Sequence, residues 1–319
     1  MKYYIVIDGG TTNTRLYLVR ETSVDSEKLS LGSGNAGSRE RLTVAVGEGL
    51  RALLERNGLT EQDVHCILAS GTITSELGLC LVPHVPAPAG IAQLHENMHP
   101  TRLPEITSIP FVFIPGVLIA SEELLQADMM RGEETELFGL LETPETDCLY
   151  VLPGSHNKLI TVDEAGRICA IRTMLTGEML ASLSRHTILS AAVDLSCDRI
   201  CEDFLLQGYE CCEQLGINEA LFKVRMLKNI FGGSREEVYS FFLGVVLHGD
   251  LRQILACREK KIIIGGQSKM QKALAVLLEA KTSKPVICAR EQQVQNSVIR
   301  GALRIYLYGC EGMQNGFCF

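Results

Sequence analysis

The sequence lacks any stretch that is long and apolar enough to cross a membrane, since a spanning helix needs about 20 apolar residues. Its start, residues 1–5, leads directly into a short predicted strand and lacks the apolar core and the cleavage site of a signal peptide. Positive charge is also scarce, because 38 acidic residues outnumber 30 basic ones and give a net charge of −8. This balance argues against a general nucleic-acid binder, although a few local Arg and Lys residues can still bind an anionic small molecule. We therefore expect a cytoplasmic protein without membrane or nucleic-acid partners.

The twelve cysteines form no CxxC pair. Several of them lie in apolar runs, as Cys148 does in residues 148–152 and Cys288 does in residues 286–289. A disulfide scaffold is not expected in a chain of 319 residues, which is long enough to bury a large core. We expect reduced, mostly buried thiols, as in a cytosolic protein.

One stretch at the N-terminus has the clearest pattern. Residues 3–8 form an apolar, β-type run that ends in Asp8; two glycines and a run of hydroxyl residues follow, and Leu16 and Leu18 then alternate as in a second strand. The pattern predicts a hairpin with Asp8 at its mouth. Because glycine lets backbone N–H groups approach a ligand, such a turn can bind a phosphate, with the carboxylate beside a hydrated cation. An ordinary turn uses the same residue types, so this stretch alone leaves both interpretations open.

The segment Gly32–Gly37 fits, as text, the GxGxxG fingerprint of dinucleotide-binding proteins. That fingerprint needs a buried strand in front of it, whereas residues 22–28 are polar. We interpret the segment as a glycine-rich loop.

Residues 95–99 match HExxH, the helix motif in which two histidines bind zinc and the glutamate acts as base. Pro100 follows directly and is expected to end the helix where a zinc protease needs it to continue. No local signature supplies a third ligand. Solvated helix residues are the favoured interpretation, and a zinc hydrolase built on His95, Glu96 and His99 is kept as an alternative that metal analysis can test.

Two further segments place polar side chains at the ends of regular elements. A buried strand is predicted at residues 64–69, and the hydroxyl-rich loop 70–75 follows it, at a place where α/β folds often bind ligands; a helix cap explains the same residues. A helix is predicted to begin at Glu133, with Glu134 also in its first turn and Arg131 just before it. Acids that match the helix dipole are the simpler interpretation of this helix taken alone.

The second half of the chain partly repeats the opening pattern. A strand at residues 148–152, a polar turn at residues 153–158 and a strand at residues 159–162 predict a second hairpin. Later, a buried strand at residues 261–264 runs into the turn Gly265-Gly266-Gln267-Ser268. One hairpin at the start of each half suggests a duplicated architecture.

This order of features resembles the sugar kinase, Hsp70 and actin superfamily, in which two related domains clamp ATP between two phosphate hairpins and a Gly-Gly adenosine turn. The motifs M-R-G-E-E-T at residues 130–135 and L-P-G-S-H-N-K at residues 152–158 resemble those of the 2-dehydro-3-deoxygalactonokinase family, over nearly the whole chain. The resemblance implies an α/β fold of two ribonuclease H-like (actin-like ATPase) domains with a nucleotide cleft between them. Residues 1–143 would hold the first phosphate hairpin and the sugar-acid site. Residues 144–319 would hold the second phosphate hairpin and the adenosine site, with the last helix near the domain interface.

The same resemblance implies an ATP-dependent carbohydrate kinase, a phosphotransferase with an alcohol group as acceptor. Its substrate would be the sugar acid 2-dehydro-3-deoxy-D-galactonate, phosphorylated on the terminal (6-) hydroxyl in galactonate and galactose catabolism, with ATP and Mg²⁺ as cofactors. The sequence does not itself distinguish this sugar acid from its close relatives. A kinase of another sugar or 2-keto-3-deoxy acid therefore remains an alternative. A non-catalytic ATP-binding regulator on the same fold is the alternative from another class. A homodimer is also left open.

The family resemblance further implies roles for individual residues. Asp8 would hold Mg²⁺ through water, and Arg131 and Arg15 would meet the anionic substrate or the transferring phosphoryl group. The residues expected to contact ATP lie in the two phosphate hairpins and the Gly-Gly turn: Gly10, Thr11, Thr12, Asn13, Gly154, Ser155, Lys158, Gly265, Gly266 and Gln267. The residues expected to contact the sugar acid come from the first domain: Arg15, Thr72, Thr74 and Ser75.

A substrate hydroxyl also needs a catalytic base. In related carbohydrate kinases an Asp that follows a Gly at the start of a helix has this role, and Gly132-Glu133 stands at the comparable place. The resemblance therefore implies Glu133 as the base, although it is Glu rather than Asp. Glu134 and His156 remain the other candidates.

Overall fold

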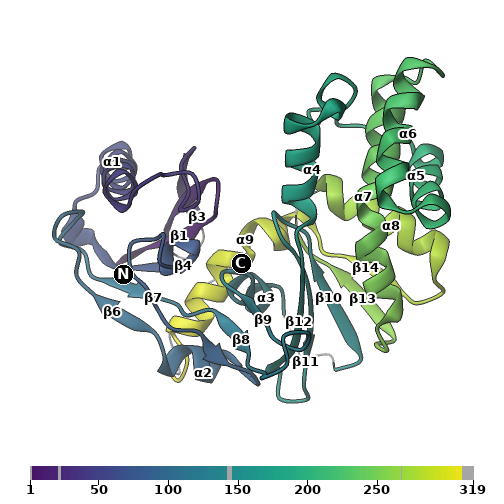
Figure 1. Cartoon of the computed structure of the whole chain (residues 1–319). Coiled ribbons are helices and arrows are strands. Elements are labelled where there is room, and N and C mark those ends of the chain that lie inside the picture. The colour runs from purple at the N-terminus through teal and green to yellow at the C-terminus, as the bar shows by residue number, and fades with distance from the viewer. Residues whose placement is uncertain (1, 21–22, 142–145, 267, 311–319) are drawn as a thin grey trace. The chain divides into compact units, whose positions relative to one another are not determined.

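The first half of the chain builds a sheet around the N-terminal strand. The computed structural model describes residues 2–20, 23–141, 146–266 and 268–310. The strands of this sheet are β1 (Tyr3–Gly9), β2 (Thr14–Val19), β3 (Ser23–Leu29), β4 (Val64–Gly71), β6 (His99–Thr101) and β7 (Phe111–Phe113). They lie in the order β3-β2-β1-β4-β7-β6 (Figure 1), with β1 antiparallel to β2 and parallel to β4. The predicted N-terminal hairpin is confirmed, and Asp8 pairs with Arg15 across it.

The polar segment before Gly32 forms strand β3, although its composition does not predict a strand. β3 is an edge strand whose residues are all exposed or half-buried, so polar side chains are tolerated there. The guanidinium of Arg56 fixes it from outside, with ion pairs of 2.6 Å to Asp25 and 2.7 Å to Glu27. It is therefore not the buried strand that a dinucleotide fingerprint requires.

Helices cover both faces of this sheet. On one face, helix α1 (Arg39–Arg56) packs its buried leucines and Val46 against Ile5 and Ile7 of β1. Successive strand residues point to opposite faces, so Tyr4 points away from α1. Its ring meets the ring of Tyr306, in helix α9 (Glu291–Tyr306), with the centroids 6.0 Å apart. β1 is thus buried from both sides, which explains its continuous apolar run.

Shorter elements connect the strands of the first half. They are the 3₁₀ turns η1 (Glu61–Asp63) and η2 (Thr72–Thr74), the helices α2 (Ile91–Glu96) and α3 (Glu133–Leu140), and the strands β5 (Val85–Pro86), β8 (Val117–Ile119) and β9 (Asp128–Met130). β5, β8 and β9 form a small separate sheet. The HExxH segment is not one helix, because α2 ends at Glu96 and His99 lies in β6. The helical geometry that a zinc protease needs is absent from this segment.

The second half of the chain repeats the sheet topology of the first. Its strands are β10 (Cys148–Leu152), β11 (Asn157–Val162), β12 (Ile168–Met174), β13 (Lys261–Ile264) and β14 (Val286–Cys288). They lie in the order β12-β11-β10-β13-β14, and β10 is antiparallel to β11 and parallel to β13. In both sheets a hairpin strand is followed by a crossover to a parallel partner. The duplicated α/β architecture is therefore confirmed.

The helices of the second half surround one long, mostly buried helix. They are α4 (Thr176–His186), α5 (Glu202–Leu215), α6 (Ile217–Asn229), α7 (Arg235–Ala256) and α8 (Ser268–Lys281), with the 3₁₀ turn η3 (Ile188–Ala191) after α4. α7 is buried over most of its length and packs along α5 and α6 (Figure 1). Gly208 and Gly244 allow this approach, since a Cβ at either would lie 2.0 Å from a carbonyl oxygen of the other helix.

Contacts within the chain divide it into two compact units. The described residues of 1–145, 162–171 and 292–319 form unit 1, and those of 146–161 and 172–291 form unit 2. α9 thus packs with the first half of the chain. The expected cut between residues 143 and 144 stays a prediction. No helix in the described ranges is long and apolar enough to span a bilayer.

The cysteines within the described ranges are all free thiols, as expected, but only four of these eleven are buried, so the expectation of mostly buried thiols is wrong. Burial raises the pKa of the Cys66 thiol to about 12, so this thiol stays protonated at neutral pH. Cys288, which we expected to be buried, is exposed. The reason is its position in β14, which is the edge strand of its sheet.

Helices α3 and α9 approach each other through two glycines. A Cβ added at Gly139 would lie 1.7 Å from the carbonyl oxygen of Ser297, and one at Gly301 would lie 1.8 Å from that of Thr135. Arg304 of α9 also donates from Nη1 to the carbonyls of Phe138 and Leu141, at the C-terminal end of α3. The position of α3 therefore depends on contact between two backbones, which leaves no room for a methyl group.

Gly301→Ala is expected to lower the free energy of unfolding by about 1–3 kcal/mol, because the added methyl group must push α9 away from α3. Gly249→Ala is the matched control within a helix. A Cβ there meets no atom within 4 Å, so the control should raise the free energy of unfolding by about 0.5–1 kcal/mol. Urea unfolding of the two variants measures both values. Equal stability of Gly301→Ala and the wild type would contradict the contact.

Candidate active site

The turn between β1 and β2 holds the first predicted phosphate site. The Gly10 N–H donates to the Asn13 carbonyl at 2.9 Å, which closes the turn. Within the described ranges the N–H groups of Thr11, Thr12 and Asn13 donate to no protein acceptor. Free N–H groups in one turn attract anions, so the geometry suits the predicted phosphate contact.

Asp8 lies at the mouth of this hairpin with its side chain 24% exposed. Burial raises the pKa of its carboxyl group, and the neighbouring Arg15 opposes that shift. Arg15 Nη1 lies 3.2 Å from Asp8 Oδ2, while Oδ1 accepts no hydrogen bond from a described residue. Ser70 pairs with Asp8 in the parallel strand β4, and its buried hydroxyl oxygen has no partner in the described structure. One carboxylate oxygen is thus available to a ligand beside an unsatisfied hydroxyl.

Three glycines bring the end of β1, the end of β4 and the start of α3 together. A Cβ at Gly71 would lie 2.3 Å from the Gly9 carbonyl oxygen, and a Cβ at Gly132 would lie 3.0 Å from the Gly71 Cα. Both Gly71 (φ 86°) and Gly132 (φ 110°) adopt backbone conformations that favour glycine. The Thr72 hydroxyl donates to the Gly9 carbonyl at 2.9 Å and fixes the first of these contacts.

Tyr17 gives independent support for this convergence. Burial raises its pKa to about 12, with smaller contributions from the charges of Asp8 and Glu136. The tyrosine on β2 therefore has Asp8 and the first turns of α3 as neighbours. Asp8 and Glu136 of α3 are therefore charged neighbours of the same side chain.

The first two acids of α3 have different environments. Glu134 is fully buried, and both of its carboxylate oxygens accept from the Gly132 N–H at 2.8 Å. Burial raises the pKa of Glu134 to about 7, and the neighbouring Glu133 adds to the shift. Glu133 is half-buried and accepts from the Arg131 N–H at 3.0 Å. Glu134 thus holds the helix start in place, and Glu133 is the acid that solvent or a substrate can reach.

Arg131 is fixed by the loop that follows β4. Its Nη1 donates to the carbonyl and hydroxyl of Thr74, at 2.7 and 2.6 Å, and to the Val82 carbonyl at 3.0 Å. Its Nη2 lies 3.1 Å from His84 Nδ1. The guanidinium therefore ties α3 to this loop, and its contact with substrate stays a prediction.

The hydroxyl residues that we expect to contact the sugar acid lie beside this guanidinium. Thr74 is buried and donates to the Gly71 carbonyl, and the Ser75 hydroxyl donates to the Thr72 carbonyl at 2.6 Å. Each hydroxyl of Thr72, Thr74 and Ser75 already has a backbone acceptor in its own turn or in β1. The structure brings these residues close to Gly9 and Arg131, and their role as substrate contacts stays a prediction.

The second predicted hairpin lies in unit 2, between β10 and β11. Gly154 and Ser155 are exposed, whereas Lys158 is buried and donates from Nζ to the Thr173 hydroxyl at 2.7 Å. His156, the third candidate base, is engaged with Glu178 at 3.0 Å.

The Gly-Gly turn after β13 lies against this hairpin. Gly265 donates to the Val151 carbonyl at 2.8 Å, and a Cβ at Gly266 would lie 2.6 Å from the Pro153 carbonyl oxygen. The two predicted nucleotide segments of unit 2 are therefore neighbours. Gln267, also expected to contact ATP, lies outside the described residues.

One buried acid that the sequence did not single out supports the second hairpin. Asp250 of α7 accepts from the Thr176 hydroxyl at 2.7 Å and from the Asn157 side chain at 2.5 Å. The side-chain oxygen Oδ1 of Asn157 in turn accepts from the Gly154 N–H at 2.9 Å. Burial raises the pKa of Asp250 to about 6, although both donors oppose this shift. An acid on the buried side of an apolar helix is the signal that could have identified it.

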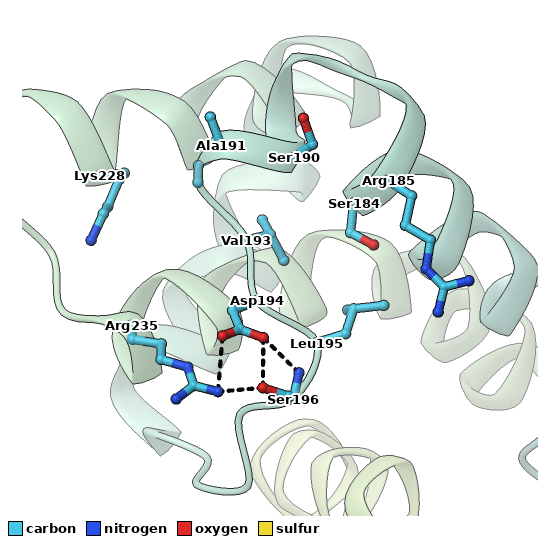
Figure 2. Close-up of a pocket in the computed structure, with 11 residues that line it drawn as sticks. Ser184, Arg185, Ser190, Ala191, Val193, Asp194, Leu195, Ser196, Lys228 and Arg235 are labelled. Carbon is cyan, nitrogen blue, oxygen red and sulfur yellow. Dashed lines mark hydrogen bonds and ion pairs between the residues drawn. The ribbon is translucent and has the colours of Figure 1, made fainter.

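A cavity of about 560 Å³ lies elsewhere in unit 2, beside α4, η3 and α7 (Figure 2). None of the predicted site residues lines it. Asp194 and Arg235 form an ion pair of 2.9 Å there, and Ser196 bonds to both (Figure 2). These three side chains satisfy one another.

Known proteins are similar to this chain in sequence and in fold. The profile of the 2-keto-3-deoxy-galactonokinase family matches residues 8–302. A probable 2-dehydro-3-deoxygalactonokinase of Rhizobium meliloti (strain 1021) is 28% identical over 194 residues, which are 60% of this chain and 59% of that relative. The match thus spans less than two thirds of the relative's length.

Solved structures show the same architecture. A candidate 2-dehydro-3-deoxygalactonokinase from Sinorhizobium meliloti has a TM-score of 0.75 at 20% identity, covering 95% of this chain and 98% of its own. The activator of the 2-hydroxyisocaproyl-CoA dehydratase from Clostridium difficile, solved with bound ADPNP, has a TM-score of 0.52 at 14% identity, covering 98% and 97%. The fold is that of the actin-like ATPases and sugar kinases. Within that class, the chain belongs to the 2-keto-3-deoxy-galactonokinase family.

Glu134→Gln is expected to change how stability depends on pH. The pKa of Glu134 is raised from 4.5 to about 7 in the folded protein, so the folded state keeps a proton that the unfolded chain releases in this range. The contribution of Glu134 to the free energy of unfolding is therefore complete below pH 4.5 and is lost as the pH rises through about 7. Wild-type stability minus that of Glu134→Gln should fall between about pH 5 and about pH 8.

Urea unfolding of the wild type and of Glu134→Gln at about pH 5 and about pH 8 measures this difference in stability. Glu96→Gln changes an exposed glutamate in the same way and serves as the control. A difference that stays constant across the range would show that Glu134 does not hold its proton in the folded protein.

Proposed function

We propose that this chain is an ATP-dependent kinase that phosphorylates the terminal 6-hydroxyl of 2-dehydro-3-deoxy-D-galactonate, in galactonate catabolism. The observation that carries the proposal is the convergence of Asp8, the free N–H groups of the β1–β2 turn and the acids of α3 through Gly9, Gly71 and Gly132. Phosphoryl transfer needs a phosphate site, a metal-positioning carboxylate and a base close together. Membership of the galactonokinase family supplies the substrate class.

The residues around Asp8 fit a magnesium ion that arrives with ATP. Mg²⁺ keeps several waters and is held by one or two carboxylates together with substrate phosphates. Asp8 offers one free oxygen, and the described residues contain no group of three or more His, Cys, Asp and Glu side chains that would form an all-protein site. When bound, the ion would neutralise charge on the transferring phosphoryl group.

Residues of both units would bind the nucleotide. In unit 1, Gly10, Thr11, Thr12 and Asn13 would present their N–H groups to the β- and γ-phosphates. In unit 2, the contacts would come from Gly154, Ser155 and Lys158 to the phosphates and from Gly265, Gly266 and Gln267 to the adenosine. Two observations favour this assignment. Gly154 and Ser155 are exposed, and Gly266 packs so closely on Pro153 that no side chain fits there.

Glu133 would accept the proton of the 6-hydroxyl. It is the half-buried acid at the start of α3, whereas both oxygens of Glu134 face the Gly132 N–H inside the protein. Arg15 and Arg131 would provide the positive charge that attracts the sugar acid and the transferring phosphoryl group. Thr72, Thr74 and Ser75 would complete the sugar-acid site.

A coupled assay of ADP release over a panel of sugars and 2-keto-3-deoxy acids tests the proposal. ADP should form with 2-dehydro-3-deoxy-D-galactonate and Mg²⁺, and NMR of the product should place the phosphate on the 6-oxygen. Asp8→Asn should lower kcat about 10²–10³-fold at an unchanged melting temperature, because it weakens metal placement. If only another sugar acid is turned over, that acid is the substrate and the assignment of 2-dehydro-3-deoxy-D-galactonate is wrong. ATP binding without any turnover would favour a non-catalytic regulator.

The base can be located by comparing two neighbouring variants. Glu133→Gln is expected to lower kcat about 10²–10⁴-fold with little change in the KM for ATP, because a proton acceptor is lost. Glu134→Gln keeps an oxygen that can accept from Gly132 and should lose less activity. The reverse order of the two effects, at matched melting temperatures, would move the base to Glu134.

A further inference from the structure

The glycine-rich segment after β3 packs against the turn between β1 and β2. We call Gly32–Asn35 the glycine loop. Its Ser33 N–H donates to the Gly10 carbonyl at 3.2 Å, and its Gly34 N–H donates to the Thr11 carbonyl at 2.9 Å. The Asn35 side chain donates from Nδ2 to the Thr12 carbonyl at 3.0 Å. Three consecutive carbonyls of the turn are thus held by one loop.

These three bonds also orient the N–H groups of the turn. A trans peptide unit is planar, so its N–H points opposite to its C=O. Holding the carbonyls of residues 10, 11 and 12 toward the glycine loop therefore directs the N–H groups of Thr11, Thr12 and Asn13 to the other side. These are the three N–H groups without a protein acceptor. The Asn13 carbonyl is occupied by the Gly10 N–H, so no turn carbonyl is left to repel an anion.

The two glycines of the loop are required by this close packing. A Cβ at Gly32 would lie 2.3 Å from the Gly10 carbonyl oxygen, and one at Gly34 would lie 2.4 Å from Thr11 Cγ2. Asn35 also accepts from the Gly32 N–H at 2.7 Å through Oδ1, which fixes the amide that faces Thr12. The first two glycines of the GxGxxG pattern are thus explained by contact with a protein turn rather than with a dinucleotide.

We propose that the glycine loop is a positioning element for nucleotide binding, with Asn35 as its positioning residue. The proposal rests on the proposed function, because it assumes that the β1–β2 turn binds the phosphates of ATP. Through the Thr12 carbonyl, Asn35 fixes the direction of the Asn13 N–H. In this role Asn35 acts on the nucleotide through the turn and not by contact with it.

Asn35→Asp separates the two hydrogen bonds of this side chain. A carboxylate can still accept from the Gly32 N–H but cannot donate to the Thr12 carbonyl. Asn35→Ala removes both bonds without adding a charge. Both variants should bind ADP about tenfold more weakly by calorimetry and raise the KM for ATP by a similar factor, with the KM for the sugar acid unchanged. Because Asn35 is exposed, the melting temperature should change little.

Asn97→Asp is the matched control. Asn97 is an exposed residue whose Nδ2 donates to the Gln93 carbonyl at 2.9 Å, outside the candidate site, so its ADP affinity should equal that of the wild type. Weaker binding by Asn35→Asp alone, with Asn35→Ala unchanged, would show a charge effect and overturn the positioning role. Unchanged binding by both variants would overturn it as well.

The same measurements keep the two proposals apart. Wild-type protein that binds ADP but turns over no sugar acid would fail as a kinase, and the Asn35 variants would still test the loop by binding alone. Wild-type protein that binds no ADP would overturn the loop proposal together with the nucleotide assignment.

Discussion

The backbone contact between Gly9, Gly71 and Gly132 is the constraint on which the candidate site depends. Each of these residues ends or begins an element, and a side chain at Gly71 or Gly132 would press against the neighbouring backbone. The contact places the carboxylate of β1 beside the hydroxyls that follow β4 and the acids that begin α3. The close fit of α3 on α9 through Gly139 and Gly301 fixes the far side of the same helix. Packing of backbone on backbone thus determines where the acids stand.

Burial of carboxylates is the main electrostatic feature of both units. Burial raises the pKa of Asp8. It also raises the pKa of Glu134 to about 7 and that of Asp250 to about 6. Each acid has a different partner that offsets the cost of burial. Asp8 has a guanidinium, Glu134 has a backbone N–H, and Asp250 has a hydroxyl and an amide. Only Asp8 keeps an oxygen without a partner in the described structure. The hydrogen-bond partners of the three acids therefore distinguish Asp8, which can bind a ligand, from Glu134 and Asp250, which hold the surrounding structure in place.

Local patterns predicted the two hairpins, the Gly-Gly turn and the start of α3, because strand alternation and turn chemistry act over a few residues. They did not predict β3, whose polar residues are stable as a strand only at a sheet edge. Nor did they predict the exposure of Cys288 or the network around Asp250, which joins residues 93 positions apart. The packing of Gly32 on Gly10 was not predicted either, since Gly32 belongs to a segment that matches a dinucleotide motif. Each of these features depends on which distant parts of the chain lie next to it in the fold.

The two hairpins that we propose to bind phosphate differ in how their carbonyls are held, although they follow the same topology. In the first, carbonyls are held from behind and three N–H groups are free. In the second, the Gly154 N–H is taken by Asn157, and the Ser155 carbonyl accepts from the Glu178 N–H at 3.1 Å. The planar peptide then directs the His156 N–H away from α4, which is the same device that orients the N–H groups of the first turn. The difference lies in what holds the carbonyls: a separate loop, Gly32–Asn35, does so in the first hairpin, whereas the start of α4 does so in the second. The first hairpin can therefore be altered at Asn35 without a change in the helix that follows it, and this makes it the more informative place to study the site.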